Sequence, residues 1–195
     1  VAIGVLRDPL INLIFRRGEF TAQAANLTSS ALLFYCPAMI AYGVRDILNK
    51  AFYSVKDAKT PMSNSFVGII INIIINIIII KYMKVSGLAL ATTISAVITT
   101  LLMMWNLNKK LEGMNIRKLV LSFVKIACSS AIMGIVIYVI NNFCMNKISS
   151  IMQQSMISIF ISFVFGSVVY FICLYFTGLE EYRNLINGLK NKITG

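Results

Sequence analysis

Apolar residues along this chain gather into long stretches, separated by short polar segments that carry most of the charge. A helix needs about 20 apolar residues to cross a hydrocarbon core of roughly 30 Å. Five stretches are of this size: Leu27–Val44, Met62–Ile80, Leu88–Trp105, Leu119–Ile140 and Met156–Phe176. Thr60 before Pro61 is the expected N-cap of the second. The pattern predicts an all-α fold, a polytopic transmembrane helix bundle.

A sixth apolar stretch, Val1–Leu6, runs directly into Arg7, Asp8 and Pro9, and no methionine precedes it. We expect it to be the outgoing end of a span that begins outside this chain. The prediction is therefore about five full spans plus one truncated span. On that expectation the chain is a fragment of a longer protein.

Composition agrees with a membrane location. Hydrophobic residues make up 58% and charged residues 13% of the chain, with a mean hydropathy of +0.81, whereas charged residues are about 25% of a typical soluble domain. Histidine is absent, the seven carboxylates lie near span ends or in loops, and the four cysteines show no paired spacing. We expect no catalytic residues, disulfide or metal cluster.

Lysine and arginine predict the orientation, because cytoplasmic loops are enriched in both. The richer side holds Arg45, Lys50, Lys56, Lys59, Lys109, Lys110, Arg117, Lys118, Arg183, Lys190 and Lys192, and the poorer side Arg16, Arg17, Lys81, Lys84 and Lys147. The 51–61 connection and the C-terminus are therefore expected in the cytoplasm. The net charge of +11 is expected to meet anionic membrane lipids, and no separate basic face indicates nucleic acid.

Two polar residues interrupt the isoleucine-rich second span. Asn72 and Asn76 lie one helical turn apart in a run, 69–80, that is otherwise isoleucine. A buried amide without a partner costs roughly 1 to 3 kcal/mol. At about 1.5 Å per residue, Asn76 and Thr92 of the next span lie at similar depths, roughly 6 and 7 Å from the outer membrane face. We expect Asn72, Asn76 and Thr92 to converge.

A stripe of small residues supports this contact. Gly87, Ala91, Ser95 and Thr99 recur every four residues, and the short 81–86 connection makes the two spans antiparallel neighbours. Two interpretations of the polar residues stay open at this point. They form an interhelical hydrogen-bonded contact, or their amide and hydroxyl oxygens hold a hard cation such as Na⁺.

Three motifs follow one another along the chain: FRRGEFTAQAANLTSSALLFY at 15–35, AFYSVKDAKTP at 51–61 and GLALATTIS at 87–95. On these motifs the chain resembles the second half of the MurJ/MviN family of lipid II flippases, within the multidrug/oligosaccharidyl-lipid/polysaccharide exporter superfamily. The resemblance covers about residues 1–110 strongly, and the last two spans match in number and position.

The resemblance implies a larger assembly. Family members have fourteen spans, with two six-helix lobes around a central cationic cavity and two C-terminal helices bordering a groove for the polyprenyl tail. On this pattern, residues 1–110 belong to the C-terminal lobe, from the end of span nine to span twelve. Residues 111–178 would hold the groove helices, spans thirteen and fourteen, and residues 179–195 an amphipathic cytoplasmic tail. The implied location is the bacterial cytoplasmic membrane.

The resemblance also implies roles for the polar residues. Asn72 resembles the Asn of the family's sodium site on span eleven, Thr92 matches the Thr from span twelve, and Asn76 falls where some members have an Asp. An amide there removes one negative charge. The remaining sodium ligand, an Asp on span seven, and the arginines that hold the lipid-linked pyrophosphate belong to the N-terminal lobe. No substrate-binding residue is assigned here; Arg7 and Arg45 are candidates by residue type alone.

The implied function is transport and not enzymatic catalysis. The chain would be part of a flippase that moves lipid II, the lipid-linked peptidoglycan precursor, from the cytoplasmic to the outer leaflet by alternating access, for cell wall synthesis. Its implied partners are lipid II, membrane lipids and the N-terminal lobe, and Na⁺ is the one candidate cofactor. The alternatives are a flippase for another polyprenyl-linked polysaccharide, a drug/cation antiporter of the same superfamily, and a non-transporting structural membrane subunit.

Overall fold

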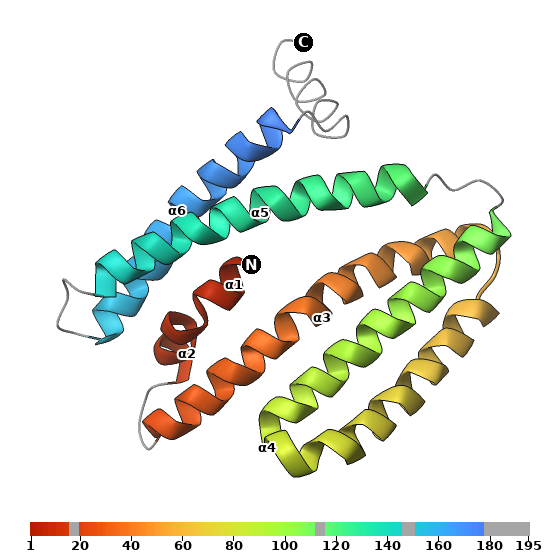
Figure 1. The fold of residues 1–195 in the computed structure, drawn as a ribbon, viewed down its shortest axis with the longest axis horizontal. Helices are drawn as coiled ribbons and strands as arrows, with labels where there is room; N and C mark the ends of the chain where they lie inside the picture. Colours follow the sequence, from red (N-terminus) through yellow and green to blue (C-terminus); the bar gives the residue numbers. More distant parts are fainter. Residues whose placement is uncertain (16–19, 112–115, 146–150, 178–195) are drawn as a thin grey trace. The chain divides into compact units, whose positions relative to one another are not determined.

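The computed structural model describes residues 1–15, 20–111, 116–145 and 151–177 (Figure 1). Within these ranges every regular element is a helix: α1 (Ala2–Val5), α2 (Arg7–Phe15), α3 (Ala22–Ser54), α4 (Lys59–Lys110), α5 (Ile116–Met145) and α6 (Ile151–Phe176). The all-α prediction is confirmed. The predicted amphipathic tail, 179–195, lies outside the described residues.

Five helical segments of the described chain are long and apolar enough to cross a membrane: Ala22–Ser54, Lys59–Met83, Val85–Lys110, Leu119–Phe143 and Met152–Phe176. Each contains one of the five predicted stretches, so the five full spans are confirmed. The segments are longer than the stretches because the helices continue into polar residues at their ends. The chain is a multi-pass membrane protein.

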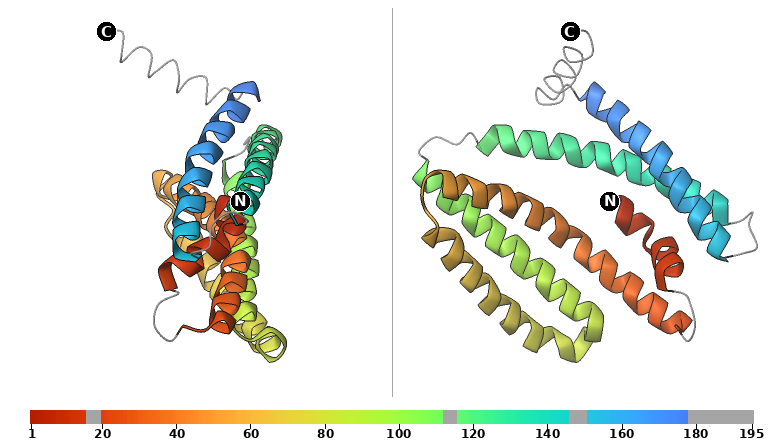
Figure 2. Two further views of the ribbon diagram at one scale, coloured as in Figure 1. Left: turned by 90° about the vertical axis from the view of Figure 1, so that its left-hand side faces the viewer. Right: turned by 180° about the vertical axis from the view of Figure 1, so that it is seen from behind.

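Helix α4 holds two of these spans and folds back on itself between them. A methyl group placed on Gly87 would lie 2.6 Å from Ile79 Cγ2, although eight residues of straight helix would separate the two positions by about 12 Å. Figures 1 and 2 show the two halves side by side and antiparallel. The predicted hairpin is present, but 81–86 stays helical, and because Gly87 lies against Ile79, the middle of the reversal is near residue 83.

The described contacts divide the chain into two compact units, one of which consists of α3 and α4. A buried apolar cluster joins the end of α3 to the end of α4, and its members are Leu48, Phe52, Met103 and Leu107. Small side chains let the two helices approach elsewhere, at Ala38, Ala41 and Ala96. The Thr100 hydroxyl donates to the Ala41 carbonyl at 3.1 Å, and the Thr93 hydroxyl donates to the Phe34 carbonyl. These contacts hold the second half of α4 against α3.

The other unit consists of α1, α5, α6 and most of α2. Ser129 of α5 and Ser158 and Ser162 of α6 are fully buried in it, and Ser158 donates to Asn141 Oδ1 at 2.7 Å. A methyl group on Gly166 of α6 would lie 2.8 Å from Ile137 Cδ1 of α5. Small residues therefore set a close approach between these helices, as is typical of membrane helix pairs.

The helix end expected at Val1–Leu6 is present, because α1 ends at Val5, and a second helix, α2, begins at Arg7 and continues to Phe15. Pro9 is tolerated because it lies in the first turn of α2, where a missing N–H removes no hydrogen bond within that helix. Leu10 N still donates to the Leu6 carbonyl at 2.9 Å, across the boundary between α1 and α2.

Candidate functional site

Asn72 and Thr92 lie on the two antiparallel halves of α4, and their side chains meet. Asn72 Nδ2 donates to Ser95 Oγ at 3.1 Å and to Thr92 Oγ1 at 3.4 Å. Asn76 Nδ2 donates to Asn72 Oδ1 at 2.9 Å. The structure thus brings the three predicted residues together and adds Ser95. These four residues are called the asparagine cluster below.

The predicted register of the two spans is off by about two residues, or roughly half a helical turn. Asn72 contacts Thr92 directly, whereas Asn76 reaches it only through Asn72. Because Gly87 lies against Ile79, the middle of the bend is near residue 83, and Asn76 pairs in depth with about residue 90. Ser95 was detectable in principle, since it follows Thr92 by three residues and so shares its helical face.

Both hydroxyls of the asparagine cluster act as acceptors toward Asn72. Thr92 Oγ1 donates to the Leu88 carbonyl and Ser95 Oγ to the Thr92 carbonyl, each at 2.9 Å. A hydroxyl has one hydrogen and two lone pairs. Their hydrogens are therefore used inside their own helix, and the lone pairs remain for an N–H group or a cation.

Asn76 Oδ1 is buried and accepts no hydrogen bond from the described residues. Leaving a buried acceptor unpaired costs about 1 to 3 kcal/mol, and hard cations take oxygen ligands of this kind. The oxygens fit a cation by type, although all of them are neutral. The described residues contain no group of three or more His, Cys, Asp or Glu able to hold a metal. The cluster thus joins the two halves of α4 through uncharged groups and leaves one acceptor unpaired.

Two further contacts join the halves of α4 on the side of the cluster away from the bend. A methyl group on Gly68 would lie 2.2 Å from Thr99 Oγ1, so the backbones approach closely there. Nearer the helix ends, Asn106 Nδ2 donates to Asn64 Oδ1 at 3.1 Å. The hairpin is therefore held at several levels, and the predicted small-residue stripe is part of its packing, with Ala91 and Thr99 fully buried.

The motif at 51–61 forms the turn between α3 and α4. The backbone N–H groups of Lys56 and Asp57 donate to the carbonyls of Tyr53 and Phe52, both at 3.0 Å, and Lys56 has a left-handed backbone with φ of 58°. This is the Schellman pattern of helix termination, in which the left-handed position is usually glycine. The turn orients Asp57 toward the start of α4.

Asp57 caps α4. Its carboxylate accepts the backbone N–H groups of Lys59 and Thr60 at 3.1 Å and the Thr60 hydroxyl at 2.6 Å. It also accepts Lys110 Nζ at 2.6 Å. Lys110 and Thr60 hold the pKa of the Asp57 carboxyl well below its usual range. The prediction of Thr60 as N-cap is therefore wrong, because the capping oxygen comes from Asp57 and Thr60 lies within the helix.

The two arginines considered for substrate binding have ordinary surface contacts. Arg7 pairs with Asp8 at 3.7 Å. The Arg45 guanidinium lies 5.9 Å from the centre of the Tyr42 ring, within reach of a cation–π interaction.

A family model described as lipid II flippase MurJ matches residues 1–160. The chain belongs to the MurJ family. The matched region includes the asparagine cluster and the 51–61 turn, so both features lie in the part of the chain that defines its membership.

MurJ relatives are similar over most of the chain. A probable lipid II flippase MurJ from Bdellovibrio bacteriovorus is 25% identical over 182 residues, or 91% of the chain and 33% of the relative. The lipid II flippase MurJ of Thermosipho africanus is 29% identical over 171 residues, or 87% and 34%. A solved structure of lipid II flippase MurJ in an inward closed conformation has a TM-score of 0.74 and 27% identity, and the match covers 95% of this chain and 35% of that one. The chain spans about a third of the length of these relatives.

Proposed function

We propose that this chain is part of a lipid II flippase, which carries the lipid-linked peptidoglycan precursor from the cytoplasmic to the outer leaflet for cell wall synthesis. The MurJ family match over residues 1–160 carries the proposal. The motif AFYSVKDAKTP, which that match includes, favours lipid II over the cargo of other members of the superfamily. Transport of this kind breaks no covalent bond, so the protein is a transporter and not an enzyme.

The packing of the α4 hairpin supports a mechanism of alternating access. In such transport, one group of helices rocks against another around a site near the middle of the membrane. The halves of α4 are joined by the Asn64–Asn106 hydrogen bond, the Gly68–Thr99 contact and the bonds of the asparagine cluster. A helix pair clamped at three levels moves as one piece, and this supports its assignment to a rocking lobe.

A chimera tests the proposal. Residues 1–160 replace the matching segment of the Thermosipho africanus relative in bacteria depleted of their own flippase. We expect growth to be restored and lipid II to become accessible to a hydrolase added outside the cells. The unmodified relative is the positive control. A chimera that reaches the membrane at the control's level but exposes no lipid II would refute the proposal.

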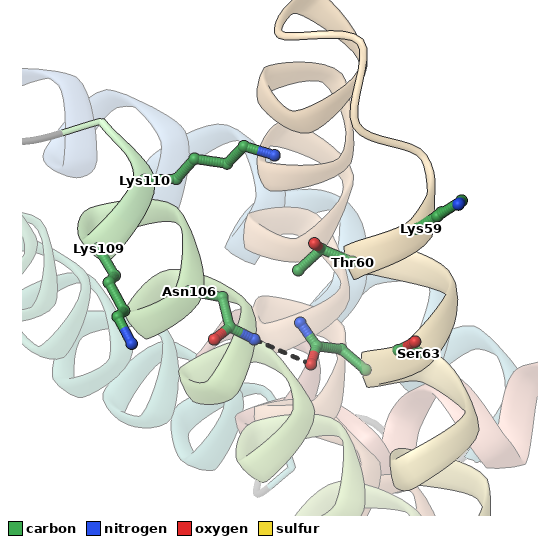
Figure 3. Close-up of a pocket in the computed structure, with 7 residues that line it drawn as sticks. Lys59, Thr60, Ser63, Asn106, Lys109 and Lys110 are labelled. Carbon is green, nitrogen blue, oxygen red and sulfur yellow. Dashed lines mark hydrogen bonds between the residues drawn. The ribbon is translucent and has the colours of Figure 1, made fainter.

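We also propose the placement of the chain in the whole transporter. Residues 1–110 form the C-terminal lobe, 111–178 the groove helices and 179–195 a cytoplasmic tail, in the bacterial cytoplasmic membrane. The N-terminal lobe, lipid II and membrane lipids are the proposed partners. Lys59, Lys109 and Lys110 gather at one end of the α4 hairpin (Figure 3), which supports a cytoplasmic location for that end. We expect a cysteine introduced at position 63 to be labelled from the cytoplasmic side of the membrane and not from the outer side.

We further propose that Asn72, Asn76 and Thr92 hold a sodium ion that biases the transport cycle. The unpaired Oδ1 of Asn76 and the acceptor orientation of Thr92 support this assignment. To drive a conformational change, the ion must bind the inward and outward states with different affinities. The alternative is a neutral clamp, which the same hydrogen bonds also support.

Thermal stability in different salts separates these two alternatives. We expect Na⁺ to raise the unfolding temperature of the purified protein above its value in K⁺ at equal ionic strength, and Asn72→Leu and Thr92→Val to lose the increment. Thr93→Val is the matched control, because the Thr93 hydroxyl binds the Phe34 carbonyl outside the cluster. If the wild type shows no increment, or both cluster variants keep it, the cluster is a neutral clamp.

A further inference from the structure

A wide, open cavity lies at the end of the α4 hairpin away from the bend, and three lysines are among its lining residues. The cavity has a volume of about 480 Å³ and lies between the two halves of the helix. Figure 3 shows Lys59, Thr60 and Ser63 on one wall and Asn106, Lys109 and Lys110 on the other. No acidic residue lines the cavity. Its polar groups are therefore mostly hydrogen-bond donors.

Asn64 also lines the cavity and supplies an unused donor. The residue is 7% exposed, and its Oδ1 accepts a hydrogen bond from Asn106. Its Nδ2 is buried and has no partner among the described residues. Buried polar groups are nearly always hydrogen-bonded, so an orphaned donor in a cavity wall favours a ligand that accepts hydrogen bonds.

The charges point to the same class of ligand. Lys110 is already paired with Asp57 at 2.6 Å. Lys59 and Lys109 are exposed and have no acidic partner among the described residues. Two positive charges thus remain uncompensated beside the cavity.

We infer that this cavity binds a phosphate group, either in the head group of an anionic phospholipid or as free phosphate. Phosphate oxygens accept hydrogen bonds from ammonium, hydroxyl and amide groups, which are the groups that Lys59, Lys109, Ser63 and Asn64 offer. Both walls belong to the ends of helical segments long and apolar enough to cross a membrane, and the ends of such segments lie near the phospholipid head groups. The site is separate from the asparagine cluster and does not depend on lipid II transport.

The single tryptophan of the chain provides an internal probe. Trp105 is 67% exposed and precedes Lys109 by four residues, so the two share a helical face. The purified protein is placed in phosphatidylcholine nanodiscs that contain brominated phosphatidylglycerol, at about one lipid in five. We expect brominated phosphatidylglycerol to quench the fluorescence of Trp105 more strongly than brominated phosphatidylcholine does. We expect Lys109→Gln and Lys59→Gln each to weaken the apparent affinity about fivefold.

Lys56→Gln is the matched control, because Lys56 is exposed and carries the same charge but does not line the cavity. A second arm measures the rise in unfolding temperature with inorganic phosphate at constant ionic strength in a neutral detergent. If the quenching by brominated phosphatidylglycerol depends on Lys59 and Lys109, the ligand is a lipid phosphate. If only the stabilisation by inorganic phosphate depends on these lysines, the ligand is free phosphate. Equal losses for all three lysine variants, or no response in either arm, would overturn the inference.

Discussion

Gly68 sits where the two halves of α4 approach closely, and Gly68→Ala tests this packing. The added methyl group would lie 2.2 Å from Thr99 Oγ1 and 3.3 Å from Thr99 Cβ. Thr99 is 1% exposed and its hydroxyl donates to the Ser95 carbonyl at 2.7 Å, so the side chain cannot rotate away without losing that bond. Overpacking of this kind costs about 1 to 3 kcal/mol, against a helix-propensity gain of about 1 kcal/mol for Ala over Gly.

Gly43→Ala is the matched control, because a methyl group there meets nothing within 4 Å. Both substitutions carry the same propensity gain, so the difference between their unfolding free energies isolates the clash, at about 1 to 3 kcal/mol. Unfolding is measured by titration with a denaturing detergent in mixed micelles. The Gly68→Ala/Thr99→Ala double variant should recover most of the loss. Equal stability of the two alanine variants, or no recovery in the double variant, would refute the close approach of the helices.

Three further substitutions test the hairpin and its turn. Asp57→Asn should lower the unfolding temperature. Because Lys110 depresses the pKa of Asp57, the difference in unfolding temperature between variant and wild type should stay constant above about pH 5. It should shrink only below about pH 4, where an ordinary aspartate takes up a proton. Lys56→Gly should raise the unfolding free energy by about 0.5 to 1 kcal/mol, since glycine adopts a φ of 58° without strain but loses more chain entropy; unchanged or reduced stability would contradict the Schellman turn. A double-mutant cycle between Asn72→Ala and Ser95→Ala should give a coupling of about 0.6 to 2 kcal/mol, and additive losses would show that the bond is absent.

The sequence predicted the spans well because a bilayer imposes one strong constraint: helices must be apolar over a fixed length. The meeting of Asn72 with Thr92 was also predictable, since a short connection forces neighbouring spans to be antiparallel. The register between these two spans was not predictable, because it depends on where α4 bends. A shift of the bend by one residue changes by two residues which side chains are level, and no pattern within 81–86 marks the apex.

The turn at 51–61 shows a different limit. A Thr–Pro pair is a good local signal for a helix start, but Asp57 takes the capping role because it also binds Lys110, which is 53 residues away in the chain. A local motif cannot indicate such a partner. The Asn64–Asn106 pair was missed for the same reason, since each residue alone resembles an ordinary polar residue near a span end.

Asn76→Asp is the substitution that best distinguishes a cation site from a neutral clamp. The hydrogens of the Thr92 and Ser95 hydroxyls are held by backbone carbonyls, so these groups can only accept. Asn76 Oδ1 is already unpaired, and a carboxylate there would add a full negative charge to oxygens able to surround an ion. We expect sodium to stabilise Asn76→Asp more than the wild type, measured as the rise in unfolding temperature over potassium. If the cluster binds no ion, the buried carboxylate should destabilise the protein equally in sodium and potassium salts. That result would show that the cluster is a neutral contact between the helices.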